Sequence, residues 1–350
     1  MDNYRSVIHQ MEDFGVVWRR TDLPLRIDEP KRRTFGKGGK WWYWLRTFRP
    51  DAGGSYIVGR FGSYKLGTSQ RVEVDWKPLG DAERARLKAE REAAQAAANE
   101  ARRQEAELAA ASAAELWAKA SREGRSDYLA RKQVQPESCR YLKEQWVLRW
   151  PGRKPGDEDT VVRLPGGTLV LPLIRYDQPR EKALRGLQFI RPDGFKIFTR
   201  GFDKTGSALR LGVVDDAVPL MLVCEGYATG LTLRMATDHT YPVYVALDAG
   251  SLQHVVPLLR QIHPTVRLLV CADDDWKTVD HAGRLNNPGK TAAMAIARKV
   301  NGCDFVYPIF EPATRDPKDT DFNDLHIRQG LEAVRLQLGG VIRAMRSIYG

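Results

Sequence analysis

The last third of the chain alternates short apolar runs with helix-forming segments, and this pattern constrains the fold more than any other feature. Strands are predicted over 220–224, 243–247, 266–272 and 305–307, and helices over 228–236, 252–262, 288–300 and 331–347. Strands joined by helices of this length predict a parallel sheet with crossover helices on its faces. We therefore expect an α/β domain over residues 219–350.

Two of the apolar runs end abruptly in carboxylates. Glu225 follows the run 220–224, and Asp273, Asp274 and Asp275 follow the run 266–272. Buried parallel strands deliver the residues after them to one edge of the sheet, where open α/β sheets usually keep their chemistry. Glu225, Asp273 and Asp275 are therefore a candidate site for divalent metal ions. Helix capping or simple exposure would explain any one of these acids alone.

The formal net charge of +11 favours a polyanionic partner, and the excess is unevenly placed. The net charge is +6 over residues 1–80, −1 over 81–123, +6 over 124–220 and zero over 221–350. All the excess thus lies upstream of the acidic site, as expected if one part of the molecule holds a nucleic acid on which another part acts. Basic residues that only keep the surface soluble are the alternative.

Between residues 31 and 49 basic and aromatic side chains alternate without a single acid. Cations can follow phosphates while rings stack on unpaired bases. With further strands predicted over 56–61 and 72–76, residues 1–77 are expected to form a small antiparallel β domain. Some rings must instead belong to its core, because Trp42 and Trp44 alternate with Trp41 and Tyr43. The candidate nucleic-acid-binding residues are Arg32, Arg33, Lys37, Lys40, Trp41, Trp44 and Arg46.

Residues 81–123 contain neither proline nor glycine and are rich in alanine and charged residues. This composition predicts one long helix with a break near Ser112. Because large apolar residues are few, we expect a solvated spacer over 78–123, with self-association through this helix as the alternative.

A further domain is expected over residues 124–218, with strands and a hairpin formed by 186–190 and 194–198. Basic side chains on such a sheet can hold triphosphate or template phosphates. Each is equally well explained as an ordinary exposed cation. The candidates are Arg191, Lys196, Lys204 and Arg210.

The four cysteines stand singly, and two of them lie inside apolar runs. We expect reduced thiols in a cytoplasmic protein, with no disulfide framework and no zinc ribbon. The first 20 residues contain no apolar run long enough for a signal peptide or a membrane helix, so no membrane association is expected.

Taken in order, these motifs resemble the Toprim catalytic domain. They are Glu225-Gly226 after a strand, Asp273-x-Asp275 after a later strand, and an acidic patch that ends in Asp321-Phe322-Asn323-Asp324. The variant Glu-Gly-Tyr-Ala-Thr loop at 225–229 and the block 287–293 are similar to primases of plasmids, phages and other mobile elements. The resemblance covers roughly residues 125–345.

The resemblance implies catalysis that depends on Mg²⁺ or Mn²⁺. Asp273, Asp275, Asp321 and Asp324 would hold the metal, Glu225 would bind metal or act as the acid/base, and Lys290 joins the candidate phosphate-binding residues. The extra acid, Asp274, leaves the metal register open by one residue. Thr229 stands where many Toprim proteins have an acid, and Asp248 after the next strand is a candidate neighbour. An ATP-binding P-loop at 289–291 is disfavoured, because the spacing to Gly283 is wrong and no strand precedes it.

Three functions are compatible with these motifs. The first is a DNA primase that joins ribonucleoside triphosphates on a single-stranded DNA template, working with a separate helicase because no helicase half follows. The second uses the same metal site in a nuclease, and the third is a non-catalytic nucleic-acid-binding module. A topoisomerase is disfavoured, since no tyrosine stands out as a nucleophile.

Overall fold

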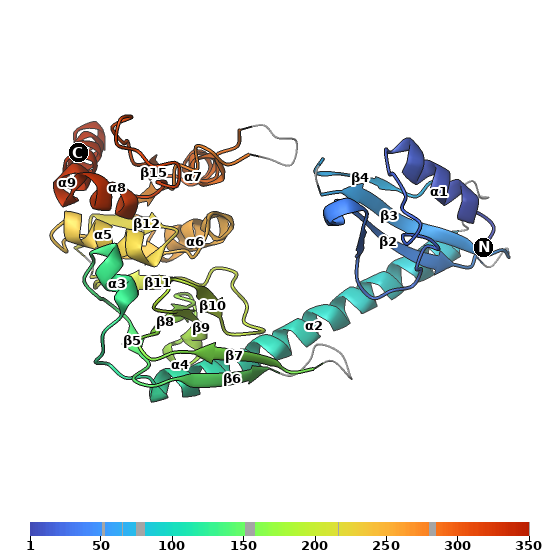
Figure 1. Cartoon of the computed structure of the whole chain (residues 1–350), viewed down its shortest axis with the longest axis horizontal. Coiled ribbons are helices and arrows are strands. Elements are labelled where there is room, and N and C mark those ends of the chain that lie inside the picture. The colour runs from blue at the N-terminus through green and yellow to red at the C-terminus, as the bar shows by residue number, and fades with distance from the viewer. Residues whose placement is uncertain are drawn as a thin grey trace. The chain divides into compact units, whose positions relative to one another are not determined.

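The computed structural model describes residues 1–50, 53–64, 66–74, 81–150, 158–215, 217–279 and 285–349 (Figure 1). It divides into two compact units, formed by 1–98 with 278–286 and by 99–277 with 287–350. The domain boundaries predicted near residues 77, 123 and 218 divide the chain more finely than these two units, and they stay predictions. In the described ranges, no helix is both long and apolar enough to cross a membrane.

The first unit contains the predicted antiparallel sheet. Its strands β1 (Arg33–Phe35), β2 (Trp41–Phe48), β3 (Tyr56–Ser63) and β4 (Thr68–Arg71) lie in the order β1-β2-β3-β4. Helix α1 (Tyr4–Asp13) covers the core face with Val7 and Met11, and a short 3₁₀ turn η1 (Lys37–Gly39) precedes β2.

The strand predicted at 72–76 is wrong over its described part. The ladder ends at Arg71, and Val72 turns into the core instead. Asp75 and Trp76 lie outside the described residues.

Helix α2 (Asp81–Lys119) is continuous, so the predicted break near Ser112 is wrong. One serine destabilises a helix by only about 0.5 kcal/mol relative to alanine. The high helix propensity of the neighbouring alanines outweighs this cost. Residues 91–105 are exposed, as expected of a spacer, but residues 106–120 are not solvated throughout. Ala106, Ala109, Ala110 and Ala113 are buried at helical spacing, and Ala113 packs in a core with Val170 and Phe189.

Residues 120–218 form mainly antiparallel structure. Strands β5 (Arg140–Tyr141), β8 (Leu169–Ile174), β9 (Leu184–Ile190) and β10 (Lys196–Phe198) make a sheet in the order β10-β9-β8-β5. Strands β6 (Trp146–Trp150) and β7 (Thr160–Leu164) form a separate ribbon, and two short helices, α3 (Asp127–Lys132) and α4 (Arg180–Ala183), complete the region. The predicted hairpin is confirmed, since Ile190 pairs with Lys196 across β9 and β10.

The predicted α/β domain is confirmed. Strands β11 (Leu209–Leu211), β12 (Leu220–Cys224), β13 (Val243–Val245), β14 (Arg267–Cys271) and β15 (Cys303–Val306) form one sheet in the order β11-β13-β12-β14-β15. All neighbours are parallel except β11, which runs antiparallel to β13. Cys224, Cys271 and Cys303 are buried in these strands as free thiols, and Cys139 is half-buried.

Helices cover both faces of this sheet (Figure 1). The core on one face contains residues of α5 (Tyr227–Ala236), α8 (Phe322–Gln329) and α9 (Leu331–Tyr349), and the core on the other contains residues of α6 (Ala249–Ile262) and α7 (Pro288–Lys299). Along β12, Leu222 faces the first core and Val223 the second. Both faces are therefore dry, which explains why the strand is apolar at every position.

The strand order places a switch point between β12 and β14. The chain leaves β12 towards β13 on one side, and leaves β14 towards β15 on the other. Connections that diverge in this way open a crevice beyond the carboxyl ends of the two strands, the usual ligand site of open α/β sheets. Glu225 and Asp273 follow these two strands.

Candidate active site

Two carboxylates at this switch point each have one buried oxygen atom without a hydrogen-bond partner in the described part of the chain. Glu225 is 9% exposed, and its Oε1 atom accepts no hydrogen bond from any described residue. Asp273, which follows β14, likewise has a buried and unpartnered Oδ1 atom. Buried polar atoms are almost always paired, because leaving one unpaired costs about 1–3 kcal/mol. Two such atoms in one crevice indicate a place for a ligand.

The raised pKa values of the acids at this switch point also indicate a place for a cation. Burial, together with repulsion from Asp275, raises the pKa of Glu225 to about 7, although the backbone N–H groups of Asp273 and Ala249 partly offset this. Burial and the neighbouring Glu225 raise the pKa of Asp273 well above its ordinary value. Burial also raises the pKa of Asp321, with Asp324 adding to it. A divalent cation would relieve this repulsion and restore the charged forms.

The donor set fits magnesium. Mg²⁺ takes hard oxygen ligands, keeps several waters, and is usually held by one or two carboxylates together with substrate phosphates. Within the described ranges, no group of three or more His, Cys, Asp or Glu side chains is placed to hold a metal by itself. The carboxylates therefore suit an ion shared with water and substrate, and Mn²⁺ has the same preference for oxygen.

The three consecutive aspartates have different environments. Asp274 is buried, and its carboxylate pairs with Arg315 at 2.9 Å and accepts from Asn287 Nδ2 at 2.6 Å. Among the described residues, Asp275 Oδ2 accepts the backbone N–H of Gly289, at 3.0 Å. Because the carboxylate of Asp274 is already engaged, the geometry favours Asp273 and Asp275 as the reactive pair.

The start of α7 is built against this pair. The Oδ1 atom of Asn287, the N-cap, accepts the backbone N–H of Lys290 at 3.2 Å and that of Asp275 at 3.0 Å. Pro288 occupies the first helical turn, as is common. A Cβ atom on Gly289 would lie 2.6 Å from the carbonyl oxygen of Asp273 and 3.0 Å from Glu225 Oε1. The Asn-Pro-Gly block therefore lets a helix end approach the carboxylates.

The third acidic patch is a helix cap. Asp321 Oδ1 accepts the backbone N–H of Asp324 at 2.8 Å, and Asp324 Oδ2 accepts that of Asp321 at 3.3 Å, which makes a capping box for α8. Lys132 Nζ lies 3.4 Å from Asp324 Oδ1. The helix-capping alternative therefore applies to this pair, and its metal-binding role stays a proposal.

Thr229 donates its hydroxyl to Asp321 Oδ2 at 3.0 Å and is fully buried. An acid at this position would face another buried carboxylate. The threonine that replaces the acid of the resembling loops therefore suits this position, because its hydroxyl can donate to Asp321. Asp248 does not replace the missing acid, because it caps α6 by accepting the N–H of Ser251.

The candidate phosphate-binding residues differ in their partners. Lys204 contacts the carboxylate of Asp248. The next residue, Ala249, donates its backbone N–H to the Glu225 carboxylate. Arg191 pairs with Asp193 at 2.8 Å. The remaining three carry no ion pair in the described part of the chain. Lys196 is exposed on β10, the Arg210 guanidinium lies 5.5 Å from the Tyr176 ring centre, and Lys290 Nζ lies 3.6 Å from that of Tyr307.

Four residues that shape the site were not among the predicted ones. Asn287 could have been recognised, since an asparagine before a proline is a common helix start. Thr229 was noticed only as a missing acid. Lys132 and Arg315 reach the acids from α3 and from the segment before α8, and no local pattern in the sequence indicates them.

The structure divides the candidates in the first unit. Trp44 is 41% exposed with the Arg46 guanidinium 5.1 Å from its ring centre, and Arg32 and Lys40 are exposed. Trp41 is half-buried, with its ring packed on the core 6.2 Å from that of Phe14, and its role in nucleic-acid binding stays a prediction. Arg33 is half-buried, 3.9 Å from Glu29. The side chain of Lys37 lies outside the described part of the chain.

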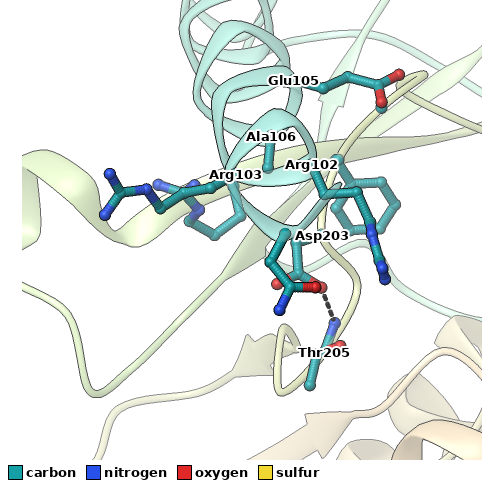
Figure 2. A pocket seen from close by; sticks show the side chains of 10 residues that line it. Arg102, Arg103, Glu105, Ala106, Asp203 and Thr205 are labelled. Atoms are coloured by element: carbon teal, nitrogen blue, oxygen red, sulfur yellow. Dashed lines mark hydrogen bonds between the residues drawn. The ribbon is translucent and has the colours of Figure 1, made fainter. Parts of the chain in front are cut away.

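A cavity of about 540 Å³ elsewhere in the second unit does not contain the carboxylates. It lies between α2 and the segment around Asp203, which accepts the N–H of Thr205 (Figure 2). Its arginines are partly engaged, since Arg103 pairs with Glu100 and Arg185 pairs with Glu107. The carboxyl ends of β12 and β14, where the acids lie, are therefore the better candidate for the active site.

Comparison with known families agrees with this placement. Residues 220–332 match the family model described as the Toprim domain. This part of the chain is a Toprim domain. The match covers every element from β12 to the start of α9, and with them Glu225, Asp273, Asp275, Asp321 and Asp324.

Relatives of this chain include two proteins named DNA primase TraC from Escherichia coli. One is 35% identical over 136 residues, which cover 38% of this chain and 9% of that protein. The other is 34% identical over 128 residues, 36% of this chain and 12% of that protein. The chain thus matches about a tenth of the length of these relatives.

Among solved structures, the DnaG primase catalytic domain bound to ssDNA is similar at 14% identity and a TM-score of 0.42, over 69% of this chain and 80% of that one.

Proposed function

We propose that this chain is a DNA primase that synthesises short RNA primers on single-stranded DNA for replication of a mobile element. The observation that carries the proposal is the pair of acids, Glu225 and Asp273, that each place a buried oxygen without a described partner at the switch point of the Toprim sheet. The two relatives named DNA primase favour this polymerase chemistry over other uses of a Toprim site.

The proposed roles follow from the contacts of each acid. Asp273 and Asp275 would hold Mg²⁺, which when bound neutralises phosphate charge and makes a 3′-hydroxyl more acidic. Asp321 and Asp324 would support the ion from the start of α8. Glu225, whose pKa is about 7, would take the proton from the attacking 3′-hydroxyl at its Oε1 atom. A base with a pKa near the working pH is best suited to that transfer.

The nucleotide would be positioned by cations around the same edge. Lys290 extends from the helix turn that contacts Asp275, and Lys204 approaches through Asp248. Arg191 and Lys204 would exchange their carboxylate partners for phosphate oxygens, while Lys196 and Arg210 have no carboxylate to exchange in the described part of the chain. Arg32 and Lys40, exposed cations of the first unit, would hold the template, and a separate helicase would unwind the duplex.

Primer synthesis by the full chain is the direct test. The protein is incubated with single-stranded DNA, labelled ribonucleotides and Mg²⁺, and the products are separated by length. We expect templated short oligomers that disappear in Asp273→Ala and persist in Asp238→Ala, a matched change at an exposed aspartate. Parallel reactions with deoxyribonucleotides report the sugar preference.

Other outcomes would point to a different function. Shortened DNA without added nucleotides would indicate a nuclease at the same metal site. Unaltered DNA and no product with either Mg²⁺ or Mn²⁺ would leave only a binding module, and the primase proposal would be wrong.

A further inference from the structure

The sheet of the first unit has one face on its core and one face away from it. Along β2, Tyr43 and Leu45 belong to the core, so Trp42, Trp44 and Arg46 point to the opposite side. Residues directly across the ladder share that side. We call this the outer face. It comprises Trp42, Trp44 and Arg46 of β2, Arg60 and Gly62 of β3, and Ser69 and Arg71 of β4.

A hollow of about 340 Å³ lies on this face. Arg32 stacks over Trp42 with its guanidinium 4.3 Å from the ring centre, and the Tyr64 ring lies 6.2 Å from that of Trp42. A Cβ on Gly62 would lie 2.9 Å from the Trp42 ring, so glycine allows this ring to lie close to the neighbouring strand. The remaining lining residues are Arg60, Ser63, Gly67, Thr68 and Ser69.

The hollow is basic, with hydroxyl groups and no carboxylate among its lining residues. Arg60 donates to Ser69 Oγ at 3.2 Å and has no carboxylate partner among the residues that the structure describes. Arg32 has no carboxylate partner in the described ranges, whereas the adjacent Arg33 lies 3.9 Å from Glu29. Arg71, directly across from Arg60, adds a further cation. Unpaired cations beside aromatic rings are the arrangement that binds single-stranded nucleic acid.

We propose that the outer face binds single-stranded DNA, with one unpaired base stacked in the hollow. Trp42 is 8% exposed with Arg32 over its ring, so the base takes the place of the Arg32 guanidinium, which turns to a phosphate. Tyr64, 39% exposed, offers a ring edge beside it. Trp44, two residues further along β2, offers a second ring roughly 7 Å away for the next base. Paired bases of a duplex cannot enter such a hollow, because their faces are already stacked.

This inference deepens the proposed template binding and rests on that part of the proposed function, but it requires no catalysis. Stacking on any base face is sequence-tolerant. We therefore expect a general single-strand site that keeps unpaired template on the first unit.

Binding of the full chain to a labelled oligo(dT) strand tests the site by fluorescence anisotropy at several salt concentrations. Tyr64→Ala should weaken binding about tenfold, and Tyr64→Phe, which keeps the ring, should restore it. Arg32→Gln and Arg60→Gln should each reduce the slope of log affinity against log salt by about 0.7. Arg20→Gln, which removes an exposed charge of the same unit from a residue that does not line the hollow, should leave the slope unchanged.

Unchanged affinity and salt slope in all three hollow variants, with thermal unfolding like that of the parent, would overturn the inference. So would equal competition by duplex DNA, or binding restricted to RNA strands. If Tyr64→Ala unfolds, the two arginine variants still decide. Asp273→Ala leaves this face intact and should bind the strand as the parent does. If the parent chain binds the strand normally but makes no primers, the primase proposal is rejected and the binding site still stands.

Discussion

Gly289 is the residue whose side chain the candidate site can least accommodate. In Gly289→Ala the new Cβ meets the carbonyl oxygen of Asp273 at 2.6 Å, so the backbone around Asp273 must shift. We expect a loss of roughly 1–3 kcal/mol in unfolding free energy and about 100-fold in primer synthesis. Gly250→Ala is the matched control, because Gly250 also occupies the second position of a helix but its Cβ would meet only Asp248 Oδ1, at 3.5 Å. Thermal unfolding and primer assays on both variants check this, and equal effects would contradict it.

The raised pKa of Glu225 predicts how stability depends on pH. Its ordinary value is 4.5 and its value in the fold is about 7, so between these limits the folded state binds more protons than the unfolded state. The free energy of unfolding should therefore fall as pH rises from about 4.5 to 7, by on the order of 2–3 kcal/mol without metal.

Magnesium should reverse this loss above pH 7 and have little effect at pH 5, where the carboxyl groups are protonated. Melting temperatures measured with Mg²⁺ and with EDTA across this range provide the test. Asp275→Asn should flatten both dependences, because it removes the charge that repels the Glu225 carboxylate most strongly. Equal stabilisation by Mg²⁺ at pH 5 and pH 8 would show that the ion binds elsewhere.

At the residue scale, the sequence predicts which strands end in acids but not what each acid does. Asp273 and Asp274 are neighbours, yet one is unpartnered and the other is paired with Arg315. Arg315 is 41 residues away in the chain, and its approach depends on the tertiary fold. The capping role of Asp321 and Asp324 was predictable in kind, since an acid three residues into a helix often forms a capping box.

Among the elements, α2 combines two environments in one helix. Ala113 is fully buried against β8 and β9, whereas Ala97 is exposed. Ala113→Glu should therefore cost about 3 kcal/mol or more, because it buries a charge without a partner, and Ala97→Glu should stay within about 0.5 kcal/mol. Chemical denaturation of both variants measures the difference. Similar stabilities would mean that the second half of α2 does not pack in solution.

Strands of the Toprim sheet were predictable because apolar runs and helical periods agree there. The packing of α2 was not, since its buried stripe is made of alanine and carries little hydrophobic signal. Helix α1 was missed although Val7 and Met11 are four residues apart. Strand β4 was misplaced because the apolar residues Val72 and Val74 continue into the core after the ladder has ended.

For the whole molecule, the uneven charge predicts separable binding and catalysis. Residues 1–80 carry 15 basic and 9 acidic residues, whereas residues 221–350 are neutral overall. Deleting residues 1–77 should weaken binding of single-stranded DNA and reduce its salt slope by about 0.7 for each phosphate that the shortened chain no longer binds. Primer synthesis at saturating template should persist. Unchanged affinity after the deletion would place the template site in the second unit.

An antiparallel sheet in the first unit and an α/β domain in the second were predictable from composition and periodicity. The strand order was not, because periodicity identifies strands without assigning their neighbours. The crevice between β12 and β14 therefore appears only in the structure.

The start of α7 also bears on how distant relatives of this chain can be found. Hydrogen bonds to Asp275 and Asp274 hold Asn287 in place, and the close approach of Asp273 requires glycine at position 289. These contacts constrain the residues on either side of the segment 276–286, but not the number of residues in it. Homologues should accept insertions and deletions in that segment while keeping asparagine and glycine two residues apart. A search pattern with a variable gap after Asp275, anchored on this helix start, should recover members that a fixed spacing would miss.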